Sequence, residues 1–387
     1  MSQNNPIWVE GIYIHVPFCL SKCPYCDFYS EIIDKRAEEY GAFLLQELNL
    51  NQNIIWNKPT VYFGGGTPSL MPPSFFASIL RNIENYSEVS LEANPASFNR
   101  TFLKEVKQIG INRFNLGIQT LQPCLLQLLE RPYTKEAALA ALEWTCVEFD
   151  NVGVDIIFGI PGQTLADIYA DLNVIAQFPI KHISAYLLTF YPGTPFYKRL
   201  KAKKIQPLPE EVQREMYFTI KEFLEARGFI HYEISNFARS GYFCKHNLLY
   251  WQLKNYLGLG AGAASLLNFT YRVNIKDVDT YYYCLSLHKL PIDEKEIWSL
   301  KEFKAISLIM GLRLLQGVHL ERLGLINQWE IVQEDPAIQA LLEENLLVFD
   351  SPYLRLSKRA LFISDAVTNI VVNAFLYVNS SSEEKNR

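Results

Sequence analysis

The sequence contains no long hydrophobic run, because none of its apolar stretches approaches the ~20 residues that a membrane-spanning helix needs. Its opening residues, MSQNNPIWVEGIYIHV, also lack the basic region followed by a long apolar stretch that marks a secretory signal. We therefore expect a cytoplasmic protein, in a reducing compartment where disulfide bonds are rare. Four cysteines are scattered along the chain, and we expect them to be buried structural thiols: Cys124, Cys146, Cys244 and Cys284.

The sequence also lacks an excess of positive charge. It has 36 Lys and Arg residues against 41 Asp and Glu residues, which gives a formal net charge of −5. Nucleic-acid binding needs a basic surface, so this balance argues against a general nucleic-acid-binding protein. With 49% hydrophobic and 20% charged residues, the composition is globular, and 387 residues suffice for one large domain and a smaller one. Only the polar tail, residues 379–387, has a composition that predicts disorder.

What the sequence does contain is a tight group of three cysteines, Cys19, Cys23 and Cys26, with the spacing CxxxCxxC. Thiolates are soft ligands that favour zinc, copper(I) or iron–sulfur clusters. A structural zinc ion and a [4Fe–4S] cluster both normally take four protein ligands, and this segment offers three. If the three thiolates hold a [4Fe–4S] cluster, one iron stays open to a ligand that is not part of the protein.

Predicted strands and helices alternate from residue 11 to residue 188. This alternation is typical of parallel β–α–β units, and six strands are too few for a closed eight-stranded barrel. The pattern ends before about residue 240, so we divide the chain into a core domain (1–235) and a smaller, mostly helical C-terminal domain (236–378). The predicted strands cover residues 11–16, 61–63, 89–92, 113–118, 152–158 and 182–188.

Glycines and polar residues follow several of these strands. Gly64–Pro68 (GGGTP) comes directly after a strand, where glycines let backbone groups approach a ligand closely; alone, the segment is more typical of an ordinary turn. In α/β folds, ligands bind at the carboxyl ends of the strands. Glu92 and Asp155 can accept hydrogen bonds from ribose hydroxyls, Gln119 can donate and accept, and Arg131 can pair with a carboxylate. Each of these side chains taken singly could equally be a surface or loop-capping residue.

Together, these motifs resemble the coproporphyrinogen oxidase-like branch of the radical S-adenosylmethionine (SAM) superfamily, the branch that contains HemN and HemW. The resemblance covers most of residues 8–270. Besides the cysteine loop and the GGGTP segment, it rests on Glu-Ala-Asn-Pro (92–95), Leu-Gly-Ile-Gln (116–119), Arg131 and Val-Asp-Ile-Ile-Phe-Gly-Ile-Pro-Gly (154–162). It implies an α/β fold in which six β/α units form an open partial barrel.

The resemblance also implies cofactors and their contacts. A [4Fe–4S] cluster would be held by Cys19, Cys23 and Cys26, and SAM would chelate the open iron through its amino and carboxylate groups. The SAM contacts of the family carry over to Tyr13, Tyr25, Gly65, Gly66, Thr67, Glu92, Gln119, Arg131 and Asp155.

Two features separate the members of this branch. HemN-type oxidases have a further cysteine two residues after the third, at the position where this sequence has Phe28. The segment His246-Asn-Leu-Leu-Tyr250-Trp251 is similar to the HNxxYW motif of the HemW haem chaperones. An imidazole nitrogen of His246 can ligate haem iron, and Tyr250 and Trp251 can pack on a porphyrin. Without the resemblance, a histidine beside aromatic residues is more typical of a buried core position.

Both features favour a haem chaperone that binds a [4Fe–4S] cluster, SAM and haem and transfers haem to acceptor haemoproteins. The alternative is an oxygen-independent coproporphyrinogen III oxidase, an enzyme in which the cofactor supplies the radical chemistry on the propionate side chains. We assign no catalytic residue, and the oxidase is the weaker interpretation. The expected partners are haem-accepting proteins and an electron donor. The oligomeric state stays open, with a homodimer as one option.

Overall fold

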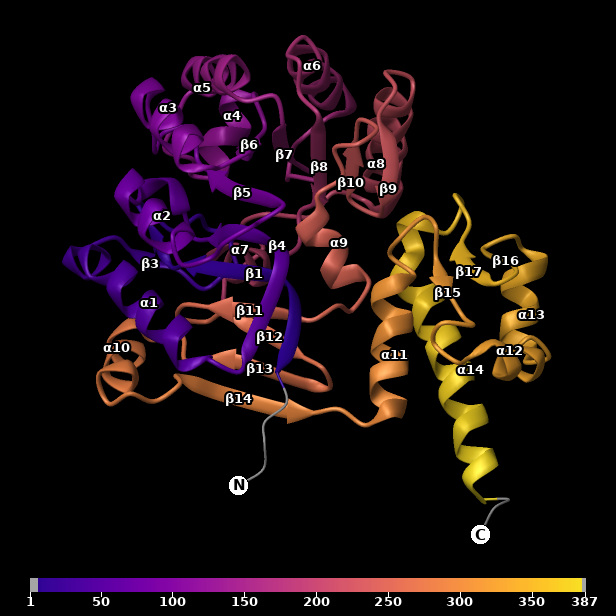
Figure 1. Ribbon diagram of the computed structural model, residues 1–387. Coiled ribbons are helices and arrows are strands. Elements are labelled where there is room, and N and C mark those ends of the chain that lie inside the picture. Colours follow the sequence, from indigo (N-terminus) through magenta and orange to yellow (C-terminus); the bar gives the residue numbers. More distant parts are fainter. Residues whose placement is uncertain (1–5, 385–387) are drawn as a thin grey trace.

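The computed structural model describes residues 6–384, which form a large mixed sheet, its covering helices and a mostly helical C-terminal part (Figure 1). The sheet has the strand order β14-β13-β12-β11-β1-β4-β5-β6-β7-β8-β10-β9. This confirms the predicted α/β class, because six neighbouring strands run parallel in chain order as the strands of an open barrel. They are β1 (Ile7–Val16), β4 (Ile54–Gly65), β5 (Glu88–Ala93), β6 (Arg113–Gln119), β7 (Val152–Phe158) and β8 (His182–Leu187).

The central strands are largely buried on both faces, and several of them also carry buried polar residues, such as Ser90 on β5 and Asn115 on β6. Ile12 and Ile14 of β1 are fully buried, as are Val152 and Val154 of β7. The carboxyl ends of parallel strands meet at one edge of the sheet, where ligands bind in folds of this kind. The sheet therefore brings the residues that follow each strand to a common place.

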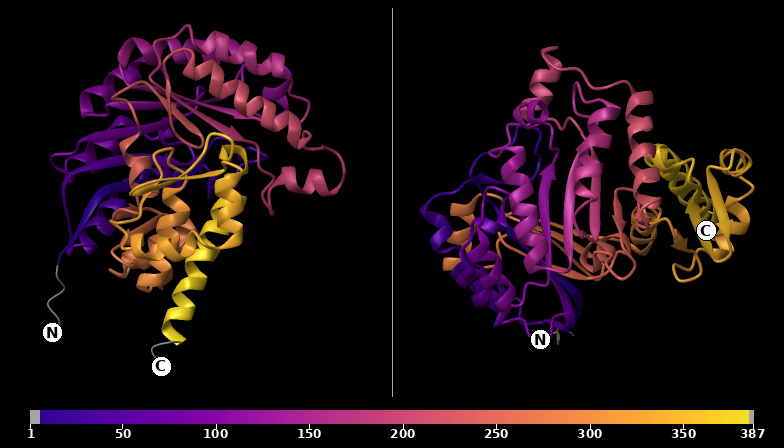
Figure 2. Two further views of the ribbon diagram at one scale, coloured as in Figure 1. Left: turned by 90° about the vertical axis from the view of Figure 1, so that its right-hand side faces the viewer. Right: turned by 90° about the horizontal axis from the view of Figure 1, so that it is seen from above.

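Helices that follow the central strands pack next to one another along the sheet (Figure 2). Several of them have capped starts, since the side chains of Asn99, Thr134 and Thr164 accept hydrogen bonds from backbone N–H groups in the first turn. The helices of this part are α1 (Tyr40–Leu50), α2 (Pro73–Leu80), α3 (Arg100–Ile109), α4 (Pro123–Leu128), α5 (Lys135–Glu148), α6 (Leu165–Ile175), α7 (Pro195–Lys201) and α8 (Glu210–Glu225), with 3₁₀ turns η1 (Lys35–Glu38) and η2 (Pro68–Leu70).

The chain after α8 extends the sheet at both edges. One edge continues antiparallel from β8, and at the other edge β11 pairs in parallel with β1. The sequence pattern did not indicate these strands; β11 depends on a partner at the opposite end of the chain, β1, and β12, β13 and β14 then pair in succession beside it. The added elements are β9 (Ile230–Glu233), β10 (Asn236–Ala238), α9 (Lys245–Trp251), β11 (Tyr256–Leu259), β12 (Ala264–Leu267), β13 (Thr270–Asn274), α10 (Val278–Ser286) and β14 (Ile292–Ile297).

The last part of the chain is mostly helical, as predicted, and α14 contacts α11, α12 and α13. Its elements are α11 (Leu300–Gly311), β15 (Val318–His319), α12 (Ile326–Val332), α13 (Pro336–Glu343), β16 (Leu347–Asp350), β17 (Tyr353–Leu356), η3 (Leu361–Ile363) and α14 (Ser364–Glu384). The domain boundary near residue 235 stays a prediction. Helix α14 includes residues 379–384 of the tail that we expected to be disordered, and residues 385–387 lie outside the described residues.

The scattered cysteines do not share one environment. Cys244 is buried and Cys146 and Cys284 are partly buried, but Cys124 is exposed. The expectation of a buried thiol was wrong for Cys124, because its neighbours Leu125 and Leu126 occupy the buried face of α4. Across the described residues, no helix combines the length and the apolar character that crossing a membrane requires.

Candidate functional site

The cysteine loop follows β1 and is held by backbone hydrogen bonds. β2 (Phe18–Cys19) pairs in parallel with β3 (Glu31–Ile32), and this pairing closes the loop that carries the three cysteines. The backbone N–H of Gly66 donates to the carbonyl oxygen of Val16 over 2.8 Å. The GGGTP segment at the end of β4 therefore lies directly against the start of the cysteine loop.

Local geometry requires glycine at two positions of the GGGTP segment. Gly65 has a φ of +110°, in the region that favours glycine. A Cβ on Gly66 would lie 2.7 Å from the carbonyl oxygen of Phe18 and 3.0 Å from Sγ of Cys19. A side chain at Gly66 would push this segment away from the cysteine loop, and one at Gly65 would clash with the ring of His15. The two glycines are therefore needed for the turn itself.

The three thiols of the loop are partly buried. Oγ1 of Thr67 donates to Sγ of Cys19 over 3.4 Å, and Nη1 of Arg131 donates to Sγ of Cys23 over 3.2 Å. Burial raises the pKa of Cys26 to about 11 and the pKa of Cys19 above its ordinary value. In the free protein these two thiols are therefore protonated, and a metal centre that binds there would release their protons.

The arrangement of the thiols bears on the kind of metal centre that they can hold. In the part of the chain that the structure describes, no three His, Cys, Asp or Glu side chains converge as ligands of a single metal ion do. A [4Fe–4S] cluster does not require that convergence, because each cysteine binds a different iron. Three thiols on one cavity wall are the ligand set that a [4Fe–4S] cluster with one open iron would take.

A cavity of about 570 Å³ lies beside the cysteine loop at the carboxyl ends of the central strands. Its volume is in the range of small-molecule and cofactor sites. The structure brings to its wall all three loop cysteines and all but one of the residues predicted to contact SAM. Those lining residues are Cys19, Cys23, Cys26, Tyr25, Gly65, Gly66, Thr67, Glu92, Gln119, Arg131 and Asp155.

Besides Asp27 of the cysteine loop, two carboxylates line the cavity, Glu92 at the end of β5 and Asp155 on β7. Oε1 of Glu92 accepts from the hydroxyl of Tyr62 over 2.6 Å, and Oδ2 of Asp155 accepts from Nδ2 of Asn115 over 2.6 Å. Desolvation, together with the charge of Asp155, raises the pKa of Glu92 to about 7. Oδ1 of Asp155 is buried and has no hydrogen-bond partner among the described residues, so a ligand hydroxyl that donated to it would satisfy it.

The guanidinium of Arg131 is held at the cavity wall by neutral groups. Nη2 donates to the carbonyl oxygen of Gly117 and Nε to the hydroxyl of Tyr133, both over 3.0 Å. Nη1 also faces the hydroxyl of Tyr25 at 3.4 Å. Within the described chain Arg131 forms no ion pair with a carboxylate. A fixed guanidinium without an acidic partner is suited to bind an anionic group of a ligand.

Gln119 ends β6 in an unusual backbone conformation. Its φ is +65°, and the pairing of β6 with β7 shifts by one residue at this point. A non-glycine residue in this region costs free energy, and such residues cluster at functional sites. A Cβ on Gly117 would lie 2.8 Å from Nε2 of Gln119, so the amide folds back over that glycine at the edge of the cavity.

Tyr13 is the predicted SAM contact that does not line the cavity. Its hydroxyl forms a hydrogen bond of 3.0 Å with Nδ1 of His15, and Nε2 of His15 forms one of 2.9 Å with the carbonyl oxygen of Tyr29. Burial lowers the pKa of His15 to about 4, so the ring is neutral at pH 7. Tyr13 thus supports the far end of the cysteine loop, and its contact with SAM stays a prediction.

The predicted haem residues lie on α9, away from the cavity wall. His246 is fully buried, with Nδ1 bonded to Oγ1 of Thr60 over 2.7 Å and Nε2 to the hydroxyl of Tyr250 over 2.8 Å. The guanidinium of Arg313 lies over the ring of Trp251, 4.8 Å from its centroid. The structure does not bring these three motif residues to the cavity, and haem ligation by His246 stays a prediction.

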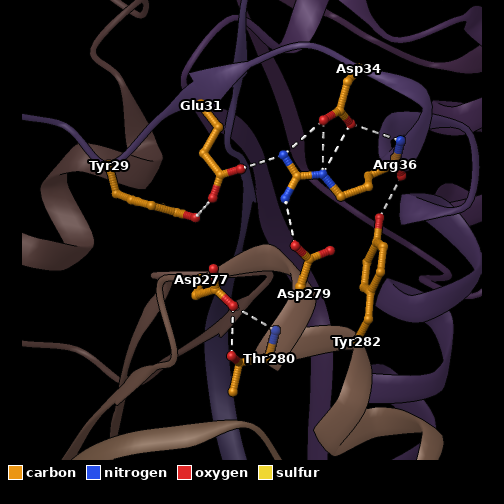
Figure 3. Close-up of polar contacts among 8 residues, drawn as sticks. All are labelled: Tyr29, Glu31, Asp34, Arg36, Asp277, Asp279, Thr280 and Tyr282. Carbon is orange, nitrogen blue, oxygen red and sulfur yellow. Dashed lines mark hydrogen bonds and ion pairs between the residues drawn. The ribbon is translucent and has the colours of Figure 1, made fainter.

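A polar network fastens the end of the cysteine loop to α10 (Figure 3). Arg36 forms ion pairs with Glu31, Asp34 and Asp279, with N···O distances of 2.7, 2.8 and 3.2 Å. The hydroxyl of Tyr282 donates to the carbonyl oxygen of Arg36 over 2.5 Å. This network ties a segment next to the candidate cluster to a helix from the second half of the chain.

Sequence reasoning missed three residues of this region, Tyr62, Asn115 and Arg36. Tyr62 and Asn115 alternate with buried apolar residues on β4 and β6, and this period of two could have placed them on the cavity side of the sheet. Arg36 carries no such signal, because its partner Asp279 is 243 residues away in the chain. Only the folded structure brings that pair together.

Comparisons with known proteins agree with this geometry. The family model of the radical SAM superfamily matches residues 13–175, and the model of the HemN C-terminal domain matches residues 307–363. The fold and the cysteine loop therefore define a radical SAM protein. The chain is 36% identical to the heme chaperone HemW of Synechocystis over 349 residues, 85% of this chain and 84% of that protein. It belongs to the HemW family.

Two further proteins extend this result. The heme chaperone HemW of Mycobacterium tuberculosis is 32% identical to this chain over 376 residues, which is 94% of each protein. The solved structure of coproporphyrinogen III oxidase HemN from Escherichia coli superposes with a TM-score of 0.78 over 96% of this chain and 90% of that chain. At 18% sequence identity, that likeness shows a shared fold.

Proposed function

We propose that this protein is a radical SAM haem chaperone. It binds a [4Fe–4S] cluster through Cys19, Cys23 and Cys26, binds SAM in the adjoining cavity, binds haem and passes haem to acceptor haemoproteins. The proposed binding of the cluster and SAM is supported by the composition of the cavity wall. The wall contains the three thiols, an Asp155 oxygen without a hydrogen-bond partner and the guanidinium of Arg131, which has no acidic partner among the described residues. The haem part draws its support from the relatives named heme chaperone HemW.

The residues at the cavity wall fit the groups of SAM. Arg131 would pair with the SAM carboxylate, and Asp155 and Glu92 would accept from the ribose hydroxyls. Gly65 and Gly66 line the cavity, where their backbone carbonyl oxygens would accept hydrogen bonds from the SAM amino group. When bound, the cluster and SAM supply the radical chemistry of the superfamily, and the chain itself binds and orients them.

The haem site is proposed on α9, with His246 as the iron ligand and Tyr250 and Trp251 as packing residues. Both ring nitrogens of His246 are hydrogen-bonded inside the protein, so ligation would require α9 to move away from β4. Function would further require haem-accepting proteins and an electron donor. A homodimer and a cytoplasmic location remain predictions.

The alternative function is an oxygen-independent coproporphyrinogen III oxidase. The likeness to HemN concerns the fold, which many activities can share. Phe28, which stands where HemN-type oxidases have a further cysteine, is exposed beside the cavity and offers no thiol. This residue favours the chaperone over the oxidase.

Anaerobic reconstitution followed by two parallel assays tests the proposal. We expect the reconstituted protein to bind haem, to transfer it to an apo-haemoprotein, and to form no protoporphyrinogen from coproporphyrinogen III. Haem binding is read from the Soret band, and turnover from the porphyrin products. Efficient turnover without haem transfer would contradict the chaperone and support the oxidase.

A further inference from the structure

The HNLLYW segment, residues 246–251, is connected to the cavity wall through one tyrosine of β4. The rings of His246 and Tyr62 are stacked, with centroids 5.1 Å apart and planes 26° from parallel. The hydroxyl of Tyr62 donates to Oε1 of Glu92 over 2.6 Å, and Glu92 lines the cavity. A buried histidine, a tyrosine and a cavity carboxylate therefore form a continuous row from α9 to the SAM site.

Glycines make room for this row. A Cβ on Gly64 would lie 3.0 Å from Cε1 of Tyr62 and 3.2 Å from Oε2 of Glu92. A Cβ on Gly11 of β1 would lie 2.6 Å from Cδ1 of Leu249 and 3.1 Å from Cε1 of His246. A side chain at Gly11 would crowd Leu249 and the His246 ring, and one at Gly64 would crowd both Tyr62 and the Glu92 carboxylate. The absence of side chains at Gly11 and Gly64 thus allows His246 of α9 to pack against Tyr62.

The position of the His246 ring is fixed by both of its nitrogens. Thr60 precedes Tyr62 by two residues on β4 and binds Nδ1 at 2.7 Å, and Tyr250 on the next turn of α9 binds Nε2 at 2.8 Å. Burial lowers the pKa of His246 to about 3, so the ring is neutral and one nitrogen donates while the other accepts. Neither nitrogen is left for a haem iron in this conformation.

We propose that His246 and Tyr62 are positioning residues for Glu92. His246 holds the ring of Tyr62, and the Tyr62 hydroxyl holds the Glu92 carboxylate in the orientation that meets a SAM hydroxyl. This assignment rests on the proposed SAM site. It gives the HNLLYW segment a role in SAM binding that differs from haem ligation.

The groups that face Glu92 show what Tyr62 contributes. Tyr13 of β1, Asp155 of β7, Tyr186 of β8 and Tyr250 of α9 all interact with the same carboxylate electrostatically, and Asn115 of β6 is its neighbour across the strand pair. Desolvation and Asp155 raise the pKa of Glu92 to about 7, and the Tyr62 hydrogen bond opposes this rise. Loss of the Tyr62 hydroxyl should therefore raise the pKa of Glu92 further.

Equilibrium dialysis of labelled SAM against the anaerobically reconstituted protein tests the assignment. The variants are Glu92→Gln, Tyr62→Phe, His246→Gln and the double variant of the last two. We expect Tyr62→Phe to weaken SAM binding about tenfold. SAM affinity should fall as the pH is lowered and Glu92 becomes protonated, and in Tyr62→Phe this fall should occur at a higher pH than in the wild type. The double variant should bind SAM no more weakly than Tyr62→Phe alone, because the histidine acts through the tyrosine.

His182→Gln is the matched control. His182 is equally buried and bonded to the hydroxyl of Tyr232 over 2.8 Å, but it starts β8 at the end of the strand away from the cavity. We expect it to leave the SAM affinity unchanged. Because Tyr62→Phe keeps the ring and removes only a hydroxyl, it tests the assignment even if His246→Gln fails to fold.

The outcomes separate this assignment from the proposed function. Unchanged SAM affinity in Glu92→Gln would contradict the SAM site itself. Weaker binding in Glu92→Gln with unchanged binding in Tyr62→Phe, or additive losses in the double variant, would overturn only the positioning role. A His246→Gln protein that loses haem while keeping wild-type SAM affinity would also overturn it and leave His246 with haem ligation alone.

Discussion

The seven cysteines of this protein differ in their burial and in whether they line the cavity. Cys19, Cys23 and Cys26 share one cavity wall, whereas Cys124 is exposed on α4. Replacing any of the three loop cysteines with serine should abolish the [4Fe–4S] absorbance after anaerobic reconstitution, because the hard hydroxyl is a poor substitute for a thiolate. Cys124→Ser should keep it. Wild-type iron and sulfide content in Cys23→Ser would rule out the cluster assignment.

Arg131 offers a second test at the residue scale. Its guanidinium has no carboxylate partner within the described chain, so a SAM carboxylate would be its ion-pair partner. Arg131→Ala should weaken SAM binding by about 2 kcal/mol, roughly thirtyfold, measured by the SAM-dependent change in the spin-resonance spectrum of the reduced cluster. Arg199→Ala, which removes the partly exposed ion-pair partner of Glu130, is the control. Equal SAM dependence in the two variants would contradict the assigned role.

At the scale of elements, the end of the cysteine loop is bonded to α10, a helix whose Asp279 lies 243 residues after Arg36 in the chain. The network around Arg36 joins the end of this loop to α10 through Asp279 and Tyr282 (Figure 3). Its ion pairs are partly exposed, and each contributes only about 0.2–1 kcal/mol to stability. The network should therefore affect local order more than global stability.

Hydrogen exchange followed by mass spectrometry can detect that local effect. In Arg36→Ala we expect faster exchange in residues 27–38 and in α10, with no change in α5, because only the first two are joined by the network. Lys254→Ala removes a surface ion pair with Glu10 and serves as the control. If the loop exchanges at the wild-type rate in Arg36→Ala, the network does not order it.

For the whole molecule, the buried carboxylate of Glu47 links the first helix to the strands and helix added late in the chain. It accepts hydrogen bonds from the hydroxyl of Tyr281 over 2.6 Å, from Nδ2 of Asn274 over 2.6 Å and from the backbone N–H of Gly260 over 2.8 Å. Burial raises the pKa of Glu47 from 4.5 to about 7. Between these two pH values the folded protein holds this proton more tightly than the unfolded chain does.

The sign of the resulting pH dependence follows from that difference. The stabilisation from Glu47 is complete below pH 4.5 and is lost as the pH rises through about 7, a loss on the order of 3 kcal/mol in the free energy of unfolding. Urea unfolding of the cluster-free protein should show a flatter pH profile for Glu47→Gln. Some slope should remain, because Glu92 and Glu233 also have pKa values raised to about 7 by desolvation.

Tyr281→Phe provides the opposite change at the same site. The Tyr281 hydrogen bond lowers the pKa of Glu47, so its removal should raise that pKa and extend the loss of stability to higher pH. Wild-type pH profiles in both variants would show that Glu47 does not control the pH dependence of stability.

The sequence by itself determined the features that depend on neighbours in the chain. The spacing of three cysteines, the glycines after β4 and the alternation of apolar strands with helices are local patterns. A local pattern is enough to predict a strand, a turn or a metal-binding loop, since each is formed by consecutive residues. The parallel order of six strands then placed Glu92, Gln119 and Asp155 at one edge of the sheet, as predicted.

Only the tertiary structure decided the roles that depend on distant partners. Whether His246 is open to a ligand depends on Thr60, which lies 186 residues earlier and occupies one ring nitrogen. Tyr13 likewise faces His15 and Tyr62 instead of the cavity, and β11 joins the sheet by pairing with β1. Burial and hydrogen bonding are set by everything that packs around a side chain, and most of those groups come from segments that are remote in the sequence.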